Sequence, residues 1–415
     1  MPSSSPATGT ATGNSRSSSG LCATHPPKGA SVRTWLAILA LAVGCFSFVS
    51  SELLPVGLLG PIADGIHLSV GMTGLLVTGF ALFVALTAGP LTVLTARFDR
   101  KWLMVALMGI NLAGNALAAS ANSFAMLLLA RLIVAAGIGI FWSIATAMAI
   151  RLVPEHQAVK ATSVVLGGLA VASVLGVPLG TFIGQSLGWH AAFLVLAGLS
   201  LLVCLWAWAL VPSLPSQGSA SLKAIAVAYR HGPIRFIFFA TSLVMTGNFL
   251  AYTYITPYLQ NVNGIAPSWI SSLLLVYGLA GVLGNFSIGR FMARSLRAAL
   301  IGTLVVLIAS MALLWAFGDV KPVAIASLVP WGMSYAALPV LLQTWVFRAA
   351  RQTGDSEAAL SLFVIAFNGA IATGALAGGL VVDTLGPKAL APLAGMAMVL
   401  SLLLVMRSRH ARDLP

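Results

Sequence analysis

Residues 161–211 read ATSVVLGGLAVASVLGVPLGTFIGQSLGWHAAFLVLAGLSLLVCLWAWALV and contain no Asp, Glu, Lys or Arg; the uncharged run continues to residue 222. A helix that crosses a bilayer needs about 20 predominantly apolar residues. This run therefore holds two such helices, with a turn at residues 185–190, QSLGWH. Backbone polar groups in lipid must be paired within the protein, and the runs are too long and continuous for barrel strands. The stretch predicts an all-α polytopic membrane protein.

The composition of the whole chain agrees with this class. Of 415 residues, 59% are hydrophobic and 7% are charged, and the mean hydropathy is +0.99. Soluble domains carry about 25% charged residues, and so few charges could not cover the surface of a soluble globule. These values argue against a soluble enzyme and a disordered regulator. The three cysteines lack the spacing of a disulfide framework or a zinc site.

Charges and polar turns divide the rest of the chain into apolar runs of similar length. Each run is long enough for one membrane-spanning helix or for two. Counted in this way, the chain has twelve spans, expected at residues 35–59, 69–94, 101–120, 123–149, 160–184, 190–211, 234–259, 267–291, 298–317, 322–347, 356–382 and 387–406.

An internal repeat groups these spans into two pseudo-symmetric six-helix bundles. Residues 75–79 read LLVTG, and residues 274–278 read LLVYG. The pair Gly176 and Gly180 has its counterpart in Gly374 and Gly378, at nearly the same distance along the sequence. Such repeats are typical of secondary transporters, whose substrate site lies between the halves near the bilayer midplane. We expect a disordered cytoplasmic tail at 1–34, bundles at 35–211 and 234–406, a cytoplasmic linker at 212–233 and a second cytoplasmic tail at 407–415.

Basic residues set the expected orientation of the spans. Most of the 22 Lys and Arg residues lie in the N-terminal tail or after every second span, as Arg97, Arg100 and Lys101 do. By the positive-inside rule, both termini are expected in the cytoplasm. The net charge of +13 is then a topology signal, and nucleic acid is not expected as a partner.

Only a few ionisable residues lie within predicted spans, and we interpret two of them as a proton-coupling pair. Glu52 and Arg131 both lie about two turns from the outer ends of their spans, so they are expected at similar depth and could face one cavity. Intramembrane charges are costly and usually mark an ion or substrate path. A change in the surroundings of Glu52 between two transporter states would change its proton affinity. The alternatives are an interfacial carboxylate for Glu52 and a structural clamp on backbone carbonyls or on the first span for Arg131.

Polar and aromatic residues within the spans are candidates for lining a substrate cavity. Trp142 lies on the same helical face as Arg131, Asn248 and Tyr252 are separated by four residues, and Asn368 falls in the middle of a Gly- and Ala-rich span. Packing between helices or interfacial anchoring is the alternative for each of them. Further candidates are Tyr254, Trp331, Tyr335 and Gln343.

Glycines in the fifth span indicate a close helix contact. Gly176, Gly180 and Gly184 share one helical face, and Pro178 lies among them. Small residues let another helix approach, and proline bends a helix. The face is either a hinge or sliding surface for alternating access or a site of static close packing.

Motifs of other chemistries are missing from the sequence. It contains no phosphate-binding GxxxxGK[ST] and no metal-binding HExxH. We therefore expect no enzymatic activity, no metal and no cofactor, with a proton gradient as the energy source.

The motifs resemble the major facilitator superfamily, in its twelve-helix drug:proton antiporter group. Residues 52–59, ELLPVGLL, resemble the first-helix signature of that group. Residues 176–180, GVPLG, with Gly188 and Trp189, resemble its fifth-helix motif. Among the subfamilies, sugar-efflux transporters are the most similar, on residues 141–144 (FWSI), 251–257 (AYTYITP) and 367–369 (FNG).

One loop departs from the family pattern. The loop between the second and third helices of the family usually reads GxLADRxGRK and helps to latch the cytoplasmic side. Here residues 92–101 read TVLTARFDRK. Arg97, Arg100 and Lys101 match, whereas Ala96 replaces the family Asp and Asp99 replaces the second Gly. Asp99 is a candidate for the missing charge of this gating loop.

The resemblance implies a proton-coupled antiporter that exports small organic solutes, sugars or sugar-like molecules first, by alternating access. It also implies a multi-pass protein of a bacterial inner membrane, a monomer that contacts substrate, protons and lipid. The alternatives of the same fold are an exporter of purine nucleosides or drugs and an uncoupled facilitator. A membrane-embedded enzyme or sensor is the alternative of another class.

Overall fold

The computed structural model describes residues 31–215, 227–350 and 356–407. In these residues, 12 helices are long and apolar enough to cross a membrane, which confirms the predicted number of spans. Most of the tail expected at 1–34, the centre of the linker expected at 212–233 and nearly all of the tail expected at 407–415 lie outside the described residues.

The N-terminal half forms one bundle of membrane-spanning helices. It consists of α1 (Val32–Gly65), α2 (Val70–Thr95), α3 (Arg100–Ala119), α4 (Phe124–Leu152), a fifth span and α7 (Trp189–Leu210). The fifth span starts with a 3-10 turn at Glu155–Gln157 and continues through α5 (Ala158–Val171), a π-helical segment at Ala172–Gly176 and α6 (Val177–Leu187).

The C-terminal half forms the second bundle. Its spans are α9 (Gly232–Tyr252), α11 (Pro267–Arg294), α12 (Leu296–Phe317), α13 (Lys321–Ala350), α14 (Ser356–Thr384) and α15 (Leu390–Arg407), which follows a 3-10 turn at Pro387–Ala389. A short helix, α10 (Ile255–Asn261), continues the direction of the chain after α9.

Two predicted spans differ in detail from the structure. The first span was expected to end at residue 59, but α1 continues through Pro55 and Pro61 to Gly65. The seventh was expected to run unbroken over 234–259, but the helix is interrupted at Thr253 and Tyr254 before α10 begins. Tyr254 lies between the two helices, and its hydroxyl donates a hydrogen bond to the carbonyl of Ala375 at 2.8 Å. This tertiary contact lies far away in the sequence, so hydropathy alone could not reveal it.

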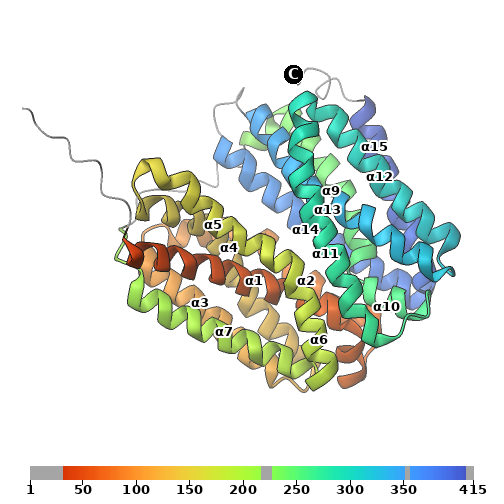
Figure 1. Ribbon diagram of the computed structural model, residues 1–415, viewed down its shortest axis with the longest axis horizontal. Helices are drawn as coiled ribbons and strands as arrows, with labels where there is room; N and C mark the ends of the chain where they lie inside the picture. The colour runs from red at the N-terminus through yellow and green to blue at the C-terminus, as the bar shows by residue number, and fades with distance from the viewer. Residues whose placement is uncertain (1–30, 216–226, 351–355, 408–415) are drawn as a thin grey trace, which may run out of the picture.

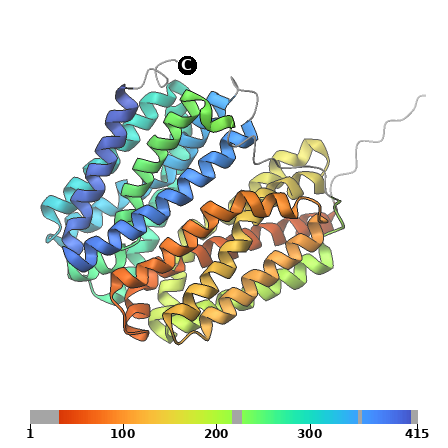
Figure 2. The same cartoon turned by 180° about the vertical axis from the view of Figure 1, so that it is seen from behind.

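The two bundles converge at one end of the molecule and diverge toward the other (Figures 1 and 2). α6 and α10 lie at the converging end, whereas α5 and the start of α14 lie apart at the opposite one (Figure 1). The diverging end is where the basic clusters of the sequence lie, and we call it the basic end. We call the converging end the closed end.

Hydrogen bonds join the two halves toward the closed end. The carboxylate of Asp383, near the end of α14, accepts hydrogen bonds from the Ser69 hydroxyl at 2.6 Å and from the Gly71 N–H at 3.0 Å. Ser69 is the N-cap of α2 and also accepts from the Met72 N–H. Asp383 therefore reinforces the N-terminus of a helix in the other half, where a negative charge is favourable. Two further hydrogen bonds between the halves, from side-chain hydroxyls to backbone carbonyls, are Thr256 to Val56 and Ser271 to Pro178.

Candidate functional site

Glu52 lies on α1, between the two halves. It is half-buried, and α1 extends about three and a half turns beyond it to Gly65, so it lies deeper than the sequence predicted. In the described residues, its carboxylate makes no hydrogen bond or ion pair. The charge of Glu52 is within electrostatic range of the Arg131 guanidinium and of the phenol of Tyr335 in the other half. Glu52 therefore presents a free carboxylate at the interface of the halves.

Arg131 is buried on α4 and holds α1 through its backbone. Its guanidinium donates hydrogen bonds to the carbonyl oxygens of Ser51 and Glu52, and it lies 4.3 Å from the centroid of the Phe80 ring. Only 1% of its surface is exposed. The structure thus brings Glu52 and Arg131 together, but through the main chain of Glu52. This geometry is the clamp on backbone carbonyls that the sequence left open as an alternative.

A polar network fixes the position of α1 next to Glu52. The Ser51 hydroxyl donates to the Asn115 amide oxygen at 2.8 Å, and the Asn115 amide donates to that of Asn111 at 2.9 Å. The Asn111 amide donates to the hydroxyls of Ser47 and Ser200 at 3.0 Å. All five side chains are fully or almost fully buried. Satisfied buried networks specify a unique arrangement of helices, and this one ties α1 to α3 and α7.

An aromatic cluster lies in the C-terminal half. The ring of Tyr252 on α9 stacks on that of Tyr277 on α11, with centroids 5.2 Å apart, and on that of Tyr335 on α13, at 5.6 Å. Trp331 on α13 packs edge-on against Tyr277 at 5.5 Å and against Tyr252 at 6.4 Å. Phe249 packs edge-on against Tyr252 and Tyr335. We call Tyr252, Tyr277, Trp331 and Tyr335 the tyrosine cluster.

Asn248 belongs to the same site, one turn before Tyr252 on α9. Its amide oxygen accepts a hydrogen bond from the Trp331 indole N–H at 3.0 Å. Its amide nitrogen is buried and has no hydrogen-bond partner among the described residues, and the same holds for the hydroxyl of Tyr277. Asn248 and Tyr252, two of the predicted substrate residues, are therefore brought together with two unpaired polar atoms beside aromatic rings.

The other two predicted substrate residues lie elsewhere. Trp142 is half-buried and packs against the core of the N-terminal half. Asn368 on α14 donates its amide to the carbonyl of Val364 on its own helix at 3.0 Å. Its neighbour Phe367 contacts Phe249 at 6.2 Å between centroids, so Asn368 lies on a helix that borders the aromatic residues.

The gating loop contacts the linker. Asp99 caps α3 by accepting from the Lys101 N–H at 2.8 Å, and it also accepts from the Ser213 hydroxyl. Partial burial acts to raise the pKa of the Asp99 carboxyl, but the hydrogen bonds from Ser213 and from backbone N–H groups outweigh it and hold this pKa below its usual value. The Arg100 N–H donates to the Leu214 carbonyl at 2.9 Å. Arg97 is exposed, and the Lys101 ammonium lies 5.6 Å from the Trp102 ring.

The glycine face of the fifth span packs against α1. A Cβ at Gly176 would meet Ser50, one at Gly180 would meet Leu54, and one at Gly184 would meet Leu58. Pro178 follows the π-helical segment at the start of α6. The glycines therefore have a packing reason within the N-terminal half.

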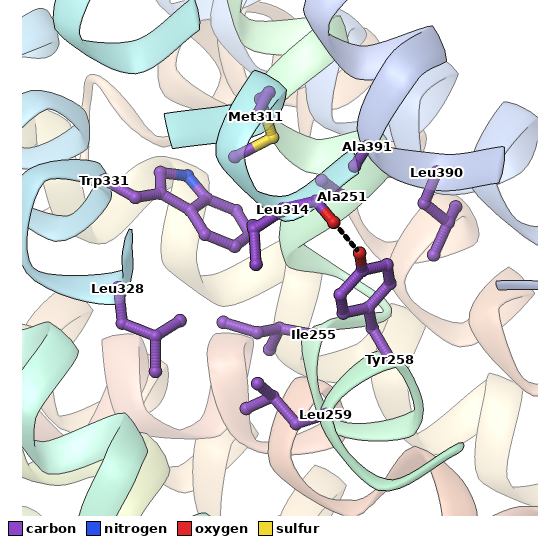
Figure 3. A pocket seen from close by; sticks show the side chains of 10 residues that line it. All are labelled: Ala251, Ile255, Tyr258, Leu259, Met311, Leu314, Leu328, Trp331, Leu390 and Ala391. Carbon is purple, nitrogen blue, oxygen red and sulfur yellow. Dashed lines mark hydrogen bonds between the residues drawn. The ribbon is translucent and has the colours of Figure 1, made fainter. Parts of the chain in front are cut away.

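A small apolar cavity of about 10 Å³ lies in the C-terminal half (Figure 3). Trp331 lines it together with Met311, Leu314 and Leu390, and the Tyr258 hydroxyl at its edge donates to the Leu314 carbonyl. The cavity has room for about one water molecule but offers no set of polar partners. Of the tyrosine cluster, Trp331 lines it but Tyr252, Tyr277 and Tyr335 do not, so the cavity lies behind Trp331 and apart from the stacked tyrosines. Among the described residues, no group of three His, Cys, Asp or Glu could hold a metal ion.

Sequence reasoning missed Tyr277 and the two network asparagines. Tyr277 replaces the Thr78 of the repeated LLVTG motif, and this difference between the halves was a usable signal. Asn111 and Asn115 are separated by four residues in an otherwise apolar span, the spacing that places both on one face.

A family model and individual relatives assign the chain to the same family. A model described as Major Facilitator Superfamily matches residues 39–356. A protein named "Probable sugar efflux transporter" from Helicobacter pylori (strain G27) is 32% identical over 349 residues, which cover 84% of this chain and 89% of that protein. A second, from Helicobacter pylori (strain ATCC 700392 / 26695), has the same identity and coverage.

Solved structures show the same fold. The nucleoside transporter NupG matches with a TM-score of 0.74 at 14% identity, over 91% of this chain and 99% of that one. A bacterial homolog of the human lysosomal transporter Spinster, described as inward-facing and unoccupied, matches with a TM-score of 0.66 at 19% identity, over 91% and 96%. With twelve apolar helices in two bundles and a family model over most of its length, the chain belongs to the Major Facilitator Superfamily of membrane transporters.

Proposed function

We propose that this protein is a proton-coupled antiporter that exports small neutral organic solutes, sugars first, by alternating access. The observation that carries the proposal is the free carboxylate of Glu52 at the interface of the halves. It is the only acidic side chain of the described residues in the middle of a membrane-spanning helix. A charge in such a position is costly. A role in taking up and releasing a proton would explain why an acidic residue lies there.

Arg131 has a positioning role in this proposal. It holds the main chain of α1 at Ser51 and Glu52, and its charge acts on the carboxylate through space. When the two bundles tilt, the surroundings of Glu52 on the side of Tyr335 change while the clamp within the N-terminal half stays. The affinity of Glu52 for a proton then differs between the two states, which is the condition for coupling.

The substrate would bind next to Glu52, on the tyrosine cluster and Asn248, with Asn368 on the bordering helix α14. The names of the 32%-identical relatives support sugar as the first class of substrate. In the proposed orientation, the basic end faces the cytoplasm of a bacterial cell, both termini lie there, and the protein works as a monomer in the inner membrane. The gating loop with Arg97, Asp99, Arg100 and Lys101 would contribute to closing this end.

The test uses purified protein in lipid vesicles with an acidic lumen. Protons leaving the vesicle should drive labelled glucose inward against its gradient, about tenfold per pH unit if one proton moves per sugar. Glu52→Gln should abolish this accumulation, because its amide cannot release a proton. Asp64→Asn, at the end of the same helix, is the matched control and should accumulate glucose as the wild type does. Glucose that only equilibrates in wild-type vesicles would indicate an uncoupled facilitator and would contradict the proposal.

A further inference from the structure

The tyrosine cluster has the chemistry of a binding site for one class of solute. We propose that Tyr277 and Asn248, held by Trp331 and Tyr252, form a neutral aromatic cradle that binds the ring of a cyclic polyhydroxy compound and rejects anions. The inference rests on the proposed export function, because it defines the substrate class of the same site.

Two unpaired polar atoms carry the argument. The Asn248 amide nitrogen and the Tyr277 hydroxyl are buried without partners, on side chains that are 0% and 5% exposed. A buried donor that makes no hydrogen bond costs free energy, and native proteins leave few such groups without a reason. Ligand hydroxyl groups, which both donate and accept, would satisfy both atoms.

The geometry of Asn248 is fixed before any ligand arrives. The Trp331 indole N–H donates to its amide oxygen, so the amide nitrogen must point away from Trp331. Trp331 is itself held against Tyr252 and Tyr277. A polar group whose orientation is set by packing and by a second hydrogen bond loses little entropy on binding. This arrangement distinguishes Asn248 from an amide that merely fills space between helices.

The aromatic surface determines what kind of solute fits. Tyr252, Tyr277 and Tyr335 stack within 28° of parallel and offer ring faces and edges beside a small number of polar groups. Ligand sites of this composition bind a molecule with an apolar surface and a few hydrogen-bonding groups. A pyranose ring has both, since its C–H groups form an apolar face and its hydroxyls lie around the rim. An open-chain polyol has the same hydroxyls but no fixed face.

The charges around the cradle exclude anions. The charged side chains of the described C-terminal spans lie near helix ends, as Arg235, Asp319 and Asp383 do. From the other half, the charge of Glu52 reaches Tyr335. The charge of Arg131 is balanced by Glu52 itself, and its terminal nitrogens already donate to backbone carbonyls. An anionic solute would therefore lose its hydration without finding an unpaired cation, a cost that is high in low-dielectric surroundings.

The experiment measures exchange without a proton gradient, so that its result does not depend on coupling. Vesicles loaded with unlabelled glucose are diluted into labelled glucose, and the half-saturating concentration is read from the counterflow. Sorbitol, the open-chain counterpart, glucosamine, glucose 6-phosphate and adenosine compete as probes. We expect glucose and glucosamine to compete, with sorbitol and glucose 6-phosphate at least tenfold weaker.

Two tyrosine variants separate binding from folding. Tyr277→Phe keeps the stacked ring and removes only the unpaired hydroxyl, so the half-saturating concentration should rise about fivefold to tenfold, the loss for one hydrogen bond to the ligand. Tyr258→Phe is the matched control, because its hydroxyl is spent on the Leu314 carbonyl outside the cradle, and it should leave this concentration unchanged.

The proposal is overturned if Tyr277→Phe exchanges glucose as the wild type does. It is also overturned if glucose 6-phosphate or sorbitol competes as well as glucose, if only adenosine competes, or if no counterflow of glucose occurs. Counterflow that meets these expectations in a protein that fails to accumulate glucose in acidic vesicles would support the cradle and contradict the proton coupling.

Discussion

At the scale of single residues, Arg131 lies close to Glu52 but binds its backbone, with no ion pair to its carboxylate. Arg131 is used up by the carbonyls of Ser51 and Glu52 and by the ring of Phe80. The Glu52 carboxylate therefore remains without a hydrogen bond in the described part of the chain. In the proposed function, a direct ion pair would hold Glu52 more strongly in its ionised form, whereas a clamp on the backbone fixes the position of Glu52 and leaves its carboxylate available for a proton.

Asp99 gives a prediction of pH dependence at the same scale. Its pKa lies below the usual value because of the hydrogen bonds from Ser213 and the backbone, so the contact between the gating loop and the linker stabilises the folded protein above the ordinary pKa of about 3.9. This stability is lost only as the pH falls through the lowered pKa. Transport by Asp99→Asn should therefore follow the same pH profile as the wild type between pH 5 and 8. A pH profile of Asp99→Asn that is displaced within this range would contradict the lowered pKa of Asp99.

The identity of the charged site residues was readable from the sequence, but their partners were not. Glu52 and Arg131 stand out because charges are rare within apolar runs. Their spacing does not show whether Arg131 donates to the Glu52 carboxylate or to a backbone carbonyl, because the choice of acceptor depends on how α1 is rotated about its axis. Tyr277 was missed for a related reason. A tyrosine in a membrane span usually serves to pack helices together. Only the assembly of α9, α11 and α13 brings Tyr277 close to Asn248.

At the scale of helices, two adjacent glycines on α5 allow a test of how closely this helix packs against α1. A Cβ at Gly168 would meet the backbone carbonyl of Ala42 on α1, whereas a Cβ at the adjacent Gly167 would meet nothing within 4 Å. Backbone cannot move aside as a flexible side chain can. We expect Gly168→Ala to destabilise the protein by about 1–3 kcal/mol and Gly167→Ala to be neutral or slightly stabilising. Thermal unfolding of both variants in detergent measures the difference, and equal midpoints would contradict this packing.

The contact between α14 and α2 predicts which state the protein prefers. The Asp383 carboxylate reaches from one half to the N-terminus of a helix in the other, and this bond must break when the closed end opens. Asp383→Ala should therefore populate states that are open at this end. Spin labels at Ser120 and Val320, on exposed positions at the closed end, should move apart, while labels at Val159 and Ala293, at the basic end, should approach.

Asp319→Ala is the control for this measurement. Asp319 lies at the same end but pairs with Lys388 of its own half, at 2.8 Å and with both side chains largely exposed. Exposed pairs contribute little, so both label distances should stay as in the wild type. The native cysteines are replaced in all variants. If Asp383→Ala leaves both distance distributions unchanged, Asp383 does not hold the closed end together.

Hydropathy predicted the helices well and their irregularities poorly. The number of spans followed from the length of the apolar runs, since a bilayer fixes that length. The π-helical segment at Ala172–Gly176 and the break at Thr253 did not follow. Both lie in apolar sequence, where helical periodicity continues through the irregularity, and tertiary contacts decide them.

At the scale of the whole molecule, the two bundles meet at the closed end and diverge at the basic end (Figures 1 and 2). The site has one wall in each half, with Glu52 on α1 and the tyrosine cluster on α9, α11 and α13. In the proposed function, a solute bound between them would touch both halves, so its binding energy would act on the equilibrium between the two states. This placement supports the proposal that proton uptake and solute binding influence each other.

The most direct measurement of this coupling is the proton movement caused by the sugar alone. Vesicles that contain the protein, a pH-sensitive dye and glucose are diluted into glucose-free medium at equal pH, with the membrane potential clamped. As glucose leaves, the lumen of wild-type vesicles should acidify, whereas Glu52→Gln should release or exchange glucose without a change in pH. Glucose efflux without acidification in the wild type, or equal acidification by Glu52→Gln, would contradict the role of Glu52 as the proton carrier.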